Sequence, residues 1–321
     1  GSNEPAVALA EKLGAVAPGE LSKVLFTTGG SDANEVALKI ARAATGRFKT
    51  LSFWDAFHGA GFGAASVGGE ATFRSHIAGP LLPGAEHVAP FHCYHCAYGH
   101  PGPEACGLAC AKMVEYVLAR EGDVAAVIAE PMRAVPVVPP PGYWQAVQAA
   151  CHRHGALLIM DEIPTGLGKT GEMFAFEHDG ITPDIVTLGK ALGGGVLPIA
   201  AVLARRDLDV CGAFAIGHYT HEKNPVTARA ALATLEVIEE EGLVARAARL
   251  GERMAAALDR QRGLGRRRRR GCANVSRGWR VSVIFAGGVS CSGWRLSATG
   301  RGGCRRRNWP SRSIIAVSRP G

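Results

Sequence analysis

The stretches ALLIMD at residues 156–161 and PDIVTLGK at residues 183–190 decide the fold. Each contains an apolar run of strand length that leads to a residue able to carry charge. Asp161 ends the first run, and Lys190 follows the second after a single glycine. Strands that are apolar throughout, and not only at alternate positions, are typical of a parallel sheet buried on both faces. We therefore predict a buried strand at each place, with Asp161 and Lys190 at the carboxyl ends.

The same alternation of strand and helix runs through most of the chain. Further strands are predicted at residues 23–27, 124–129 and 199–203, and helices at 31–44, 143–154 and 225–241. This order predicts an α/β fold, in which a mainly parallel sheet carries helices on both faces. Ligands of such sheets bind beyond the carboxyl ends of the strands, where Glu130, Asp161 and the turn of Gly189 and Lys190 are expected to lie.

The length of 321 residues allows one large domain and a smaller one, and 47% hydrophobic residues is ordinary for a globular protein. No run approaches the roughly 20 apolar residues that span a membrane. The N-terminal residues 1–5 lack the basic and apolar regions of a signal peptide. We therefore expect a cytoplasmic protein with no membrane partner, whose nine cysteines are reduced thiols.

Charge is distributed unevenly along the chain. Residues 263–321 hold 14 arginines and no Lys, Asp or Glu, which leaves 22 basic and 28 acidic residues in 1–262. Arg, Gly, Ser, Cys and Trp together are what a GC-rich gene yields when read out of frame, so we interpret the tail as the product of a frameshift near Leu264. The rival interpretation is a basic arm that binds nucleic acid.

The glycine-rich segment after Asp161 does not have the spacing of a nucleotide-binding P-loop. Residues 168–170 match the end of the motif G-x-x-x-x-G-K-[ST], but its first glycine would fall on Ile163. Residues 161–171 instead resemble the Asp-Glu-Val-Gln-x-Gly-x-Gly-Arg-Thr-Gly signature of class III (ornithine/4-aminobutyrate-type) aminotransferases. Residues 183–195 resemble the motif that carries this family's cofactor lysine.

The resemblance covers about residues 21–250, and it implies pyridoxal 5′-phosphate (PLP) as cofactor and fold type I of the PLP enzymes. The family builds its small domain from both chain ends, so we expect that domain to be incomplete, in a chain truncated at its N-terminus. The expected parts are a PLP-binding large domain at 1–240, the start of the C-terminal small domain at 241–262, and an aberrant tail at 263–321 that is not natively folded.

The resemblance also assigns roles to residues that would hold the cofactor. Lys190 would bond to PLP and later move a proton, and Asp161 would pair with the nitrogen of the cofactor ring. Gly30 and Ser31, at the start of a predicted helix, would bind the phosphate through free amides. Thr220 matches the family threonine that reaches the phosphate of a neighbouring subunit, which implies a homodimer with shared active sites.

Four further positions follow from the same motifs. Phe57 and His58 match the family's aromatic-His-Gly, whose aromatic ring stacks on the cofactor; the alternative for Phe57 is an ordinary core position. Ile163 would pack on the other ring face, and Glu130 would line the substrate site.

Three departures from the family pattern surround this expected site. Pro164 stands where the family often has Gln, residues 132–136 replace a glycine-containing run, and residues 221–223 replace Phe-Gly-Gly. We hypothesise an atypical amine substrate, with Arg133 or Lys223 contacting an anionic group such as a carboxylate, phosphate or phosphonate. The alternative is that both are solvated surface charges.

A cysteine cluster offers a metal site as an alternative. The pairs at 93 and 96 and at 106 and 110 have spacings that suit zinc, with histidines nearby. Similar pairs occur in class III relatives without an implied metal, so no metal is expected.

The leading prediction is an aminotransferase that moves an amino group from an amine or amino acid to a 2-oxo acid, with donor and acceptor left open. The alternative enzyme is a PLP-dependent lyase that eliminates phosphate or hydroxyl from a phosphorylated or phosphonate amino-alcohol. An alternative of another class is a basic nucleic-acid-binding protein acting through the tail. We expect small molecules and no nucleic acid as partners. Because its small domain is expected to be incomplete, the activity of this chain itself is left open.

Overall fold

The computed structural model describes residues 2–134 and 137–266 of the chain, and its seven strands form a single mixed sheet. Their order in the sheet is β1-β7-β6-β5-β4-β2-β3. The strands are β1 (Lys23–Thr27), β2 (Lys49–Phe53), β3 (Ala85–Val88), β4 (Val124–Ala129), β5 (Leu157–Asp161), β6 (Ile185–Leu188) and β7 (Ala200–Ala204).

The prediction of a mainly parallel sheet is confirmed. Strands β3, β2, β4, β5 and β6 run parallel to one another, whereas β7 is antiparallel to both β6 and β1. A parallel neighbour needs a crossover connection, usually a helix, but β6 and β7 are joined by a short segment whose only helix is η3 (Lys190–Gly193). This short connection explains why β7 turns back beside β6.

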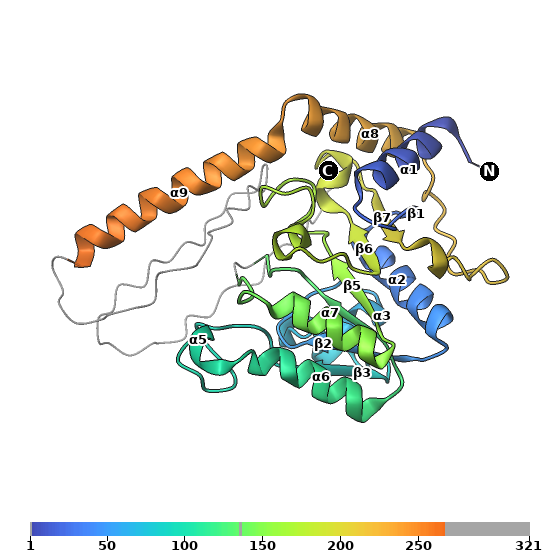
Figure 1. The fold of residues 1–321 in the computed structure, drawn as a ribbon. Coiled ribbons are helices and arrows are strands. Elements are labelled where there is room, and N and C mark those ends of the chain that lie inside the picture. The colour runs from blue at the N-terminus through green and yellow to red at the C-terminus, as the bar shows by residue number, and fades with distance from the viewer. Residues whose placement is uncertain (1, 135–136, 267–321) are drawn as a thin grey trace, which may run out of the picture. The chain divides into compact units, whose positions relative to one another are not determined.

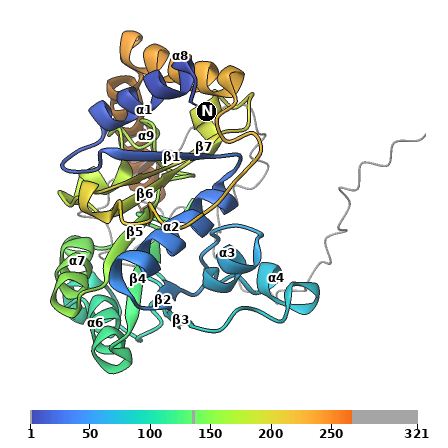
Figure 2. The same ribbon diagram turned by 90° about the vertical axis from the view of Figure 1, so that its right-hand side faces the viewer.

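Helices cover both faces of the sheet, as predicted (Figures 1 and 2). Helix α2 packs on one face through an apolar cluster that includes Val36 and Ile40, and α1, α6, α7 and α8 pack on the other. The helices are α1 (Glu4–Val16), α2 (Gly30–Thr45), α3 (Phe62–Val67), α4 (Ala71–Arg74), α5 (Pro103–Cys106), α6 (Ala109–Glu121), α7 (Tyr143–His154), α8 (Pro225–Glu240) and α9 (Leu243–Arg266).

Local sequence explains where the longer helices begin. Asn3 and Asn224 cap α1 and α8, each accepting a hydrogen bond from a backbone amide of the first turn, and a proline follows near each start. Helix α7 ends at Gly155, whose φ of 64° is the left-handed conformation that glycine adopts at low cost. The predicted helices at 31–44, 143–154 and 225–241 therefore agree with α2, α7 and α8 to within a residue.

The C-terminal part of the described chain is the long helix α9, which runs to Arg266. The predicted boundary after residue 262 falls inside this helix. Residues 267–321, to which the frameshift and nucleic-acid interpretations mostly refer, lie outside the described residues. Within the described part, no helix combines the length and the apolar character that a membrane span requires.

Candidate active site

Asp161, the last residue of β5, is a buried carboxylate surrounded by hydrogen-bond donors. It is 2% exposed. Its Oδ2 lies 2.8 Å from both Asn34 Nδ2 and His58 Nδ1, and its Oδ1 accepts the amide of Ile163 at 3.1 Å. A buried charge is tolerated when it is paired and hydrogen-bonded. These contacts fix the orientation of the carboxylate at the carboxyl end of the sheet.

Asn34 ties the segments of this site together. It is fully buried on α2, and its amide donates to the carbonyl of His58 at 2.7 Å as well as to Asp161. Its own oxygen accepts the hydroxyl of Thr187 on β6 at 2.8 Å. A buried polar network is stabilising when every member is satisfied, and here one side chain connects α2, β5, β6 and the loop after β2.

His58 is hydrogen-bonded to the buried carboxyl group of Asp161 and is close enough to that of Glu130 to affect its pKa. Its side chain is 0% exposed, one ring nitrogen bonds Asp161, and the other, Nε2, is buried with no hydrogen-bond partner among the described residues. Glu130, at the end of β4, accepts the amide of Ala134 at 3.2 Å. Burial raises the pKa of the Glu130 carboxyl; His58 opposes this and Asp161 adds to it. The imidazole therefore interacts with the carboxyl groups at the ends of two neighbouring strands, β5 and β4.

The N-terminus of α2 offers free backbone amides beside this cluster. Gly29 caps the helix without a side-chain hydrogen bond, so the first amides have no side-chain acceptor. Ser31 Oγ accepts the amide of Ala60 at 3.0 Å, which brings the loop after His58 against the helix end. Free amides and the helix dipole together favour an anion such as a phosphate.

Two glycines allow the start of α2, the loop after His58 and the segment at Ile163 to approach one another closely. A Cβ on Gly30 would lie 2.7 Å from Ile163 Cδ1, and a Cβ on Gly59 would lie 2.4 Å from Ser31 Oγ. Neither distance is sterically acceptable, so both positions require glycine unless a neighbour moves. Ile163 also lies against Gly189, where a Cβ would be 3.4 Å from its Cγ2. The predicted residues Gly30, Ser31, His58 and Ile163 are therefore brought together around Asp161.

Lys190 follows β6 at the same end of the sheet. Thr187 of β6 is paired in register with Asp161, so Lys190 comes three residues beyond that level. Its side chain is exposed, and its φ of 45° is left-handed. For a residue other than glycine, this conformation costs on the order of 1 kcal/mol and is concentrated at functional sites.

The remaining predicted residues are placed differently. Phe57 is 38% exposed, and its ring packs on Phe73 with centroids 4.4 Å apart. Arg133 forms a 2.7 Å ion pair with Glu70. Thr220 is exposed, and within the described residues it makes no hydrogen bond to the Asp161 cluster.

The second predicted anion contact is also paired. Lys223 forms a 2.6 Å ion pair with Glu222, its neighbour in sequence. Both hypothesised anion-binding cations therefore already face a carboxylate.

Sequence reasoning missed three polar residues of this region: Asn34, Thr187 and Glu162. Glu162 is fully buried, and its oxygens accept the amide of Phe176 at 3.0 Å and the hydroxyl of Thr165 at 2.5 Å. Burial raises the pKa of its carboxyl to about 7. The available signal was polarity at positions where the surrounding helix or strand pattern predicts burial.

The cysteines at 93, 96, 106 and 110 line one small hollow together with aromatic and histidine side chains. All four are free thiols, and burial raises the pKa of Cys110 to about 11. Among the described residues, no three His, Cys, Asp or Glu side chains are arranged to hold a metal ion.

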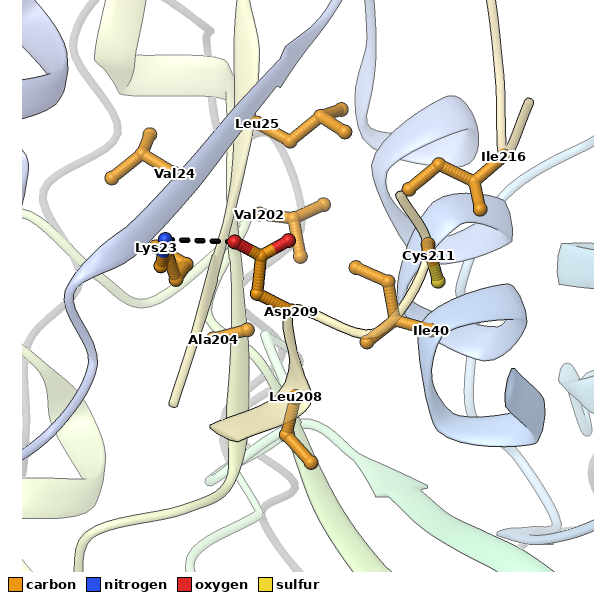
Figure 3. Close-up of a pocket in the computed structure, with 10 residues that line it drawn as sticks. All are labelled: Lys23, Val24, Leu25, Ile40, Val202, Ala204, Leu208, Asp209, Cys211 and Ile216. Atoms are coloured by element: carbon orange, nitrogen blue, oxygen red, sulfur yellow. Dashed lines mark ion pairs between the residues drawn. The ribbon is translucent and has the colours of Figure 1, made fainter. Parts of the chain in front are cut away.

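A cavity of about 320 Å³ lies elsewhere, between β1, β7 and α2 (Figure 3). Lys23 and Asp209 form a 2.7 Å ion pair beside its apolar walls. Lys23 is level, through Ala204, with Ile185 at the start of β6. The cavity extends from there to Leu25 and Val202, which are level with Thr187, but it lies on strands β1 and β7 and contains none of the predicted site residues.

Comparison with known proteins agrees with this geometry. A family model described as aminotransferase class-III matches residues 2–272. The chain is 43% identical over 257 residues to the (R)-1-hydroxy-2-aminoethylphosphonate ammonia-lyase of Vibrio splendidus (strain 12B01), with 76% of this chain and 53% of that protein covered. The chain therefore spans about half the length of this curated relative.

Two solved structures are also similar. An (S)-enantioselective omega-transaminase from Thermomicrobium roseum superposes with a TM-score of 0.77 at 32% identity, over 82% of this chain and 61% of that one. A PLP-bound amine transaminase from an uncultivated Pseudomonas species gives 0.74 at 34% identity, over 78% and 61%.

Proposed function

The chain belongs to the class III aminotransferase family, and on that premise we propose that it binds PLP and acts as an aminotransferase. It would move an amino group from an amine or amino acid to a 2-oxo acid. The observation that carries the proposal is the buried, fully hydrogen-bonded Asp161 at the same sheet end as the exposed amine of Lys190.

The residues present fit this cofactor. Asp161 supplies the fixed negative charge that a protonated ring nitrogen requires, and the N-terminus of α2 supplies donors for a phosphate. The close approaches at Gly30 and Gly59 bring the start of α2 against Ile163 and against the loop after His58. The buried Nε2 of His58 has no partner among the described residues. When bound, PLP withdraws electrons from the bond to the substrate carbon next to the nitrogen.

Residues of this chain hold the cofactor, move the proton and position the groups that do so. Lys190 holds the cofactor and then moves a proton at the substrate carbon, for which an exposed, flexible amine is suited. Asn34 and His58 hold Asp161 in position. Glu130 lines the substrate side, and burial raises the pKa of its carboxyl there.

The working unit is a homodimer in which Thr220 of one copy serves the site of the other. Thr220 is exposed and stands apart from the Asp161 hydrogen-bond network of its own chain. Large exposed hydrophobic side chains are frequent in residues 54–82, the segment that includes Phe57, and such exposure favours a protein interface. They are Trp54, Phe57, Phe62, Phe73, Ile77 and Leu82.

Shared sites predict complementation between two inactive variants. Lys190→Ala and Thr220→Ala are each expected to be impaired, but a heterodimer of the two contains one intact site. Random reassociation should therefore restore about a quarter of the original activity, because half of the dimers are mixed. A monomer by analytical ultracentrifugation, or no recovery from mixed dimers, contradicts the shared site.

A cytoplasmic location is supported by the free thiols of the described cysteines.

A lyase that removes phosphate or ammonia from a small amine is the second candidate. The 43% identity to an ammonia-lyase and the departures around Pro164 and Arg133 favour it. Against it, Arg133 is already paired with Glu70 and would have to leave that carboxylate to bind a phosphonate.

The deciding experiment tests first whether PLP bonds to Lys190 and then whether turnover requires a 2-oxo acid as amino acceptor. PLP is added to the purified chain and to Lys190→Ala, and the spectrum is recorded before and after borohydride reduction. We expect a visible band in the wild type only, with the reduced label on Lys190. Amine consumption is then measured with and without a 2-oxo acid. Dependence on the acceptor supports the aminotransferase, turnover without it supports the lyase, and no band from a folded wild type contradicts both.

A further inference from the structure

Thr187 places a buried hydroxyl in an otherwise apolar strand. Strand β6 reads IVTL at residues 185–188, and Thr187 is 0% exposed. A valine has nearly the same shape and would suit a buried strand, whereas a buried hydroxyl costs free energy unless it is hydrogen-bonded. Thr187 is paired in register with Asp161 of β5, so the sheet holds the two residues side by side. The hydroxyl therefore lies at the Asp161 cluster, where the proposed function gives it no role.

The single proton of this hydroxyl has two acceptors within reach. Asn34 Oδ1 lies 2.8 Å from Thr187 Oγ1, and Asp161 Oδ1 lies 3.5 Å from it. A distance of 2.8 Å is typical of a hydrogen bond from a hydroxyl, whereas 3.5 Å is well beyond the usual range. The proton is therefore donated to Asn34 and does not occupy Asp161 Oδ1.

This donation matches the direction in which the Asn34 amide points. Asn34 Nδ2 lies 2.7 Å from the carbonyl oxygen of His58 and 2.8 Å from Asp161 Oδ2, and both of these oxygens are acceptors. A flipped amide would turn its oxygen toward them. Without the Thr187 hydroxyl, Asn34 Oδ1 would be a buried acceptor that has lost its donor, and the amide would be held less firmly against Asp161.

The acceptor positions of Asp161 are mostly occupied. An ionised carboxylate offers about four of them. Asn34 and His58 donate to Oδ2, and the amide of Ile163 donates to Oδ1. Among the described residues this leaves about one position, on Oδ1, for which the Thr187 hydroxyl would compete if Asn34 did not accept its proton. A further donor such as a protonated ring nitrogen needs that position.

We propose that Thr187 is a positioning residue for the ring nitrogen of the cofactor, because its hydroxyl holds the Asn34 amide against Asp161 and leaves Asp161 Oδ1 free; the inference rests on the proposed function. Hydrogen bonds in a chain strengthen one another, so a hydroxyl that donates to the amide oxygen makes the amide N–H a better donor. Thr187 thus acts on the carboxylate through Asn34, and its effect is specific to the part of the cofactor that Asp161 binds.

The test compares PLP with its carbon analogue, in which C–H replaces the ring nitrogen. The affinity for each is measured without substrate, by spectral titration of wild type, Thr187→Val and Thr187→Ser. Thr187→Val is expected to bind PLP about tenfold more weakly. It should bind the analogue as the wild type does, because the analogue presents no nitrogen to Asp161. Thr187→Ser retains the hydroxyl and should retain the affinity for PLP.

The chain offers a matched control at Thr50. This residue is as buried on β2 as Thr187 is on β6, but its hydroxyl has no hydrogen-bond partner in the described part of the chain. Thr50→Val should therefore leave the affinity for PLP unchanged. In a chain that already carries Asn34→Ala, Thr187→Val should cause no further loss, because the hydroxyl acts through Asn34.

The outcomes separate the inference from the proposed function. An unchanged PLP affinity in Thr187→Val, or equal losses for PLP and the analogue, overturns the inference and leaves the proposed function standing. A Thr187→Ser protein that binds PLP as weakly as Thr187→Val also overturns it. Thr187→Ala lacks the hydroxyl as well and gives the same comparison where Thr187→Val does not fold. A folded wild type that binds no PLP overturns the proposed function, and the inference with it.

Discussion

Asp161 keeps its place because each segment around it contributes a donor. Asn34 is the most demanding of these contacts, since its amide serves both Asp161 and the carbonyl of His58 while its oxygen accepts from Thr187. Removing such a side chain leaves several buried polar groups without partners at once. The cost then exceeds that of a single lost hydrogen bond, because each orphaned group has also lost its water.

Asn34→Ala is therefore expected to lower the free energy of unfolding by about 2–4 kcal/mol and to weaken PLP binding at least tenfold. Urea denaturation and a fluorescence titration with PLP measure the two effects. Asn3→Ala is the matched control, because it removes the cap of α1 and a hydrogen bond to the carbonyl of Lys223 but no contact of Asp161, and it should cost about 1 kcal/mol with little effect on PLP affinity. Equal PLP affinity in Asn34→Ala and wild type would show that Asp161 needs no such support.

The buried carboxyl of Glu162 should make the free energy of unfolding depend on pH. Burial raises the pKa of its carboxyl from 4.5 to about 7, so the folded chain binds this proton more tightly than the unfolded chain. The stabilisation is complete below about pH 4.5 and is lost as pH rises to 7. Each pKa unit corresponds to about 1.4 kcal/mol, so the loss approaches about 3 kcal/mol.

The neutral variant Glu162→Gln should lack this loss. Compared with wild type, its free energy of unfolding should rise between pH 4.5 and 7 by the amount that Glu162 costs. Urea denaturation at several pH values gives the difference, in which all other groups cancel. Glu115→Gln, a change at a largely exposed ion pair with Arg153, serves as control. Parallel curves for Glu162→Gln and wild type would contradict the raised pKa.

Among the elements, α2 places both the phosphate-binding amides and Asn34. Its first turn approaches Ile163 so closely that a Cβ at position 30 would lie 2.7 Å from Ile163 Cδ1. Gly30→Ala therefore requires the Ile163 side chain to move. We predict a loss of about 1–3 kcal/mol in stability and weaker PLP binding.

Gly14→Ala gives the contrast for this prediction. Gly14 lies within α1, and a Cβ there would meet nothing closer than 3.8 Å. The same substitution should therefore stabilise the chain by about 0.5–1 kcal/mol, since alanine favours the helix interior. Thermal denaturation of both variants measures the effects. A Gly30→Ala protein as stable as Gly14→Ala would mean that Ile163 relocates without cost.

How far the sequence predicts the elements depends on their burial. Strands β4, β5 and β6 are apolar throughout, and they were predicted nearly to the residue. Strands β2 (KTLSF) and β3 (AEHV) escaped prediction because they contain polar residues and β3 is a short edge strand. Antiparallel β7 had a predictable position but no local signal of direction.

The same reasoning separates the predictable part of the site from the rest. Asp161 and Lys190 stand at strand ends, so topology alone brings them to one edge. Asn34 meets Asp161 across 127 residues, and Arg133 meets Glu70 across 63. Such pairings depend on the side-chain packing of distant segments, which no local pattern records.

At the scale of the whole molecule, we expect residues up to Arg266 to bind the cofactor and residues 267–321 to carry the excess positive charge. The expected cofactor residues lie in the described part of the chain, and 13 of the 14 arginines in residues 263–321 come after Arg266. Helix α9 belongs with the site, because Val244 and Ala248 lie against Gly168 and Gly171, which flank Lys169 in the segment after Asp161. A cut after Arg266 should therefore remove the basic charge and leave the site.

We predict that the chain ending at Arg266 binds PLP as well as the full chain does. The cut removes 13 positive charges and no negative ones, so any retention on DNA or heparin should be lost, together with its dependence on salt. A second truncation after Gly242, which also removes α9, should bind PLP more weakly because it uncovers the segment after Asp161. Spectral titration with PLP and salt elution measure the two properties on the same preparations. If the cut at Arg266 abolished PLP binding, the tail would belong to the enzyme, and its interpretation as the product of a frameshift would be wrong.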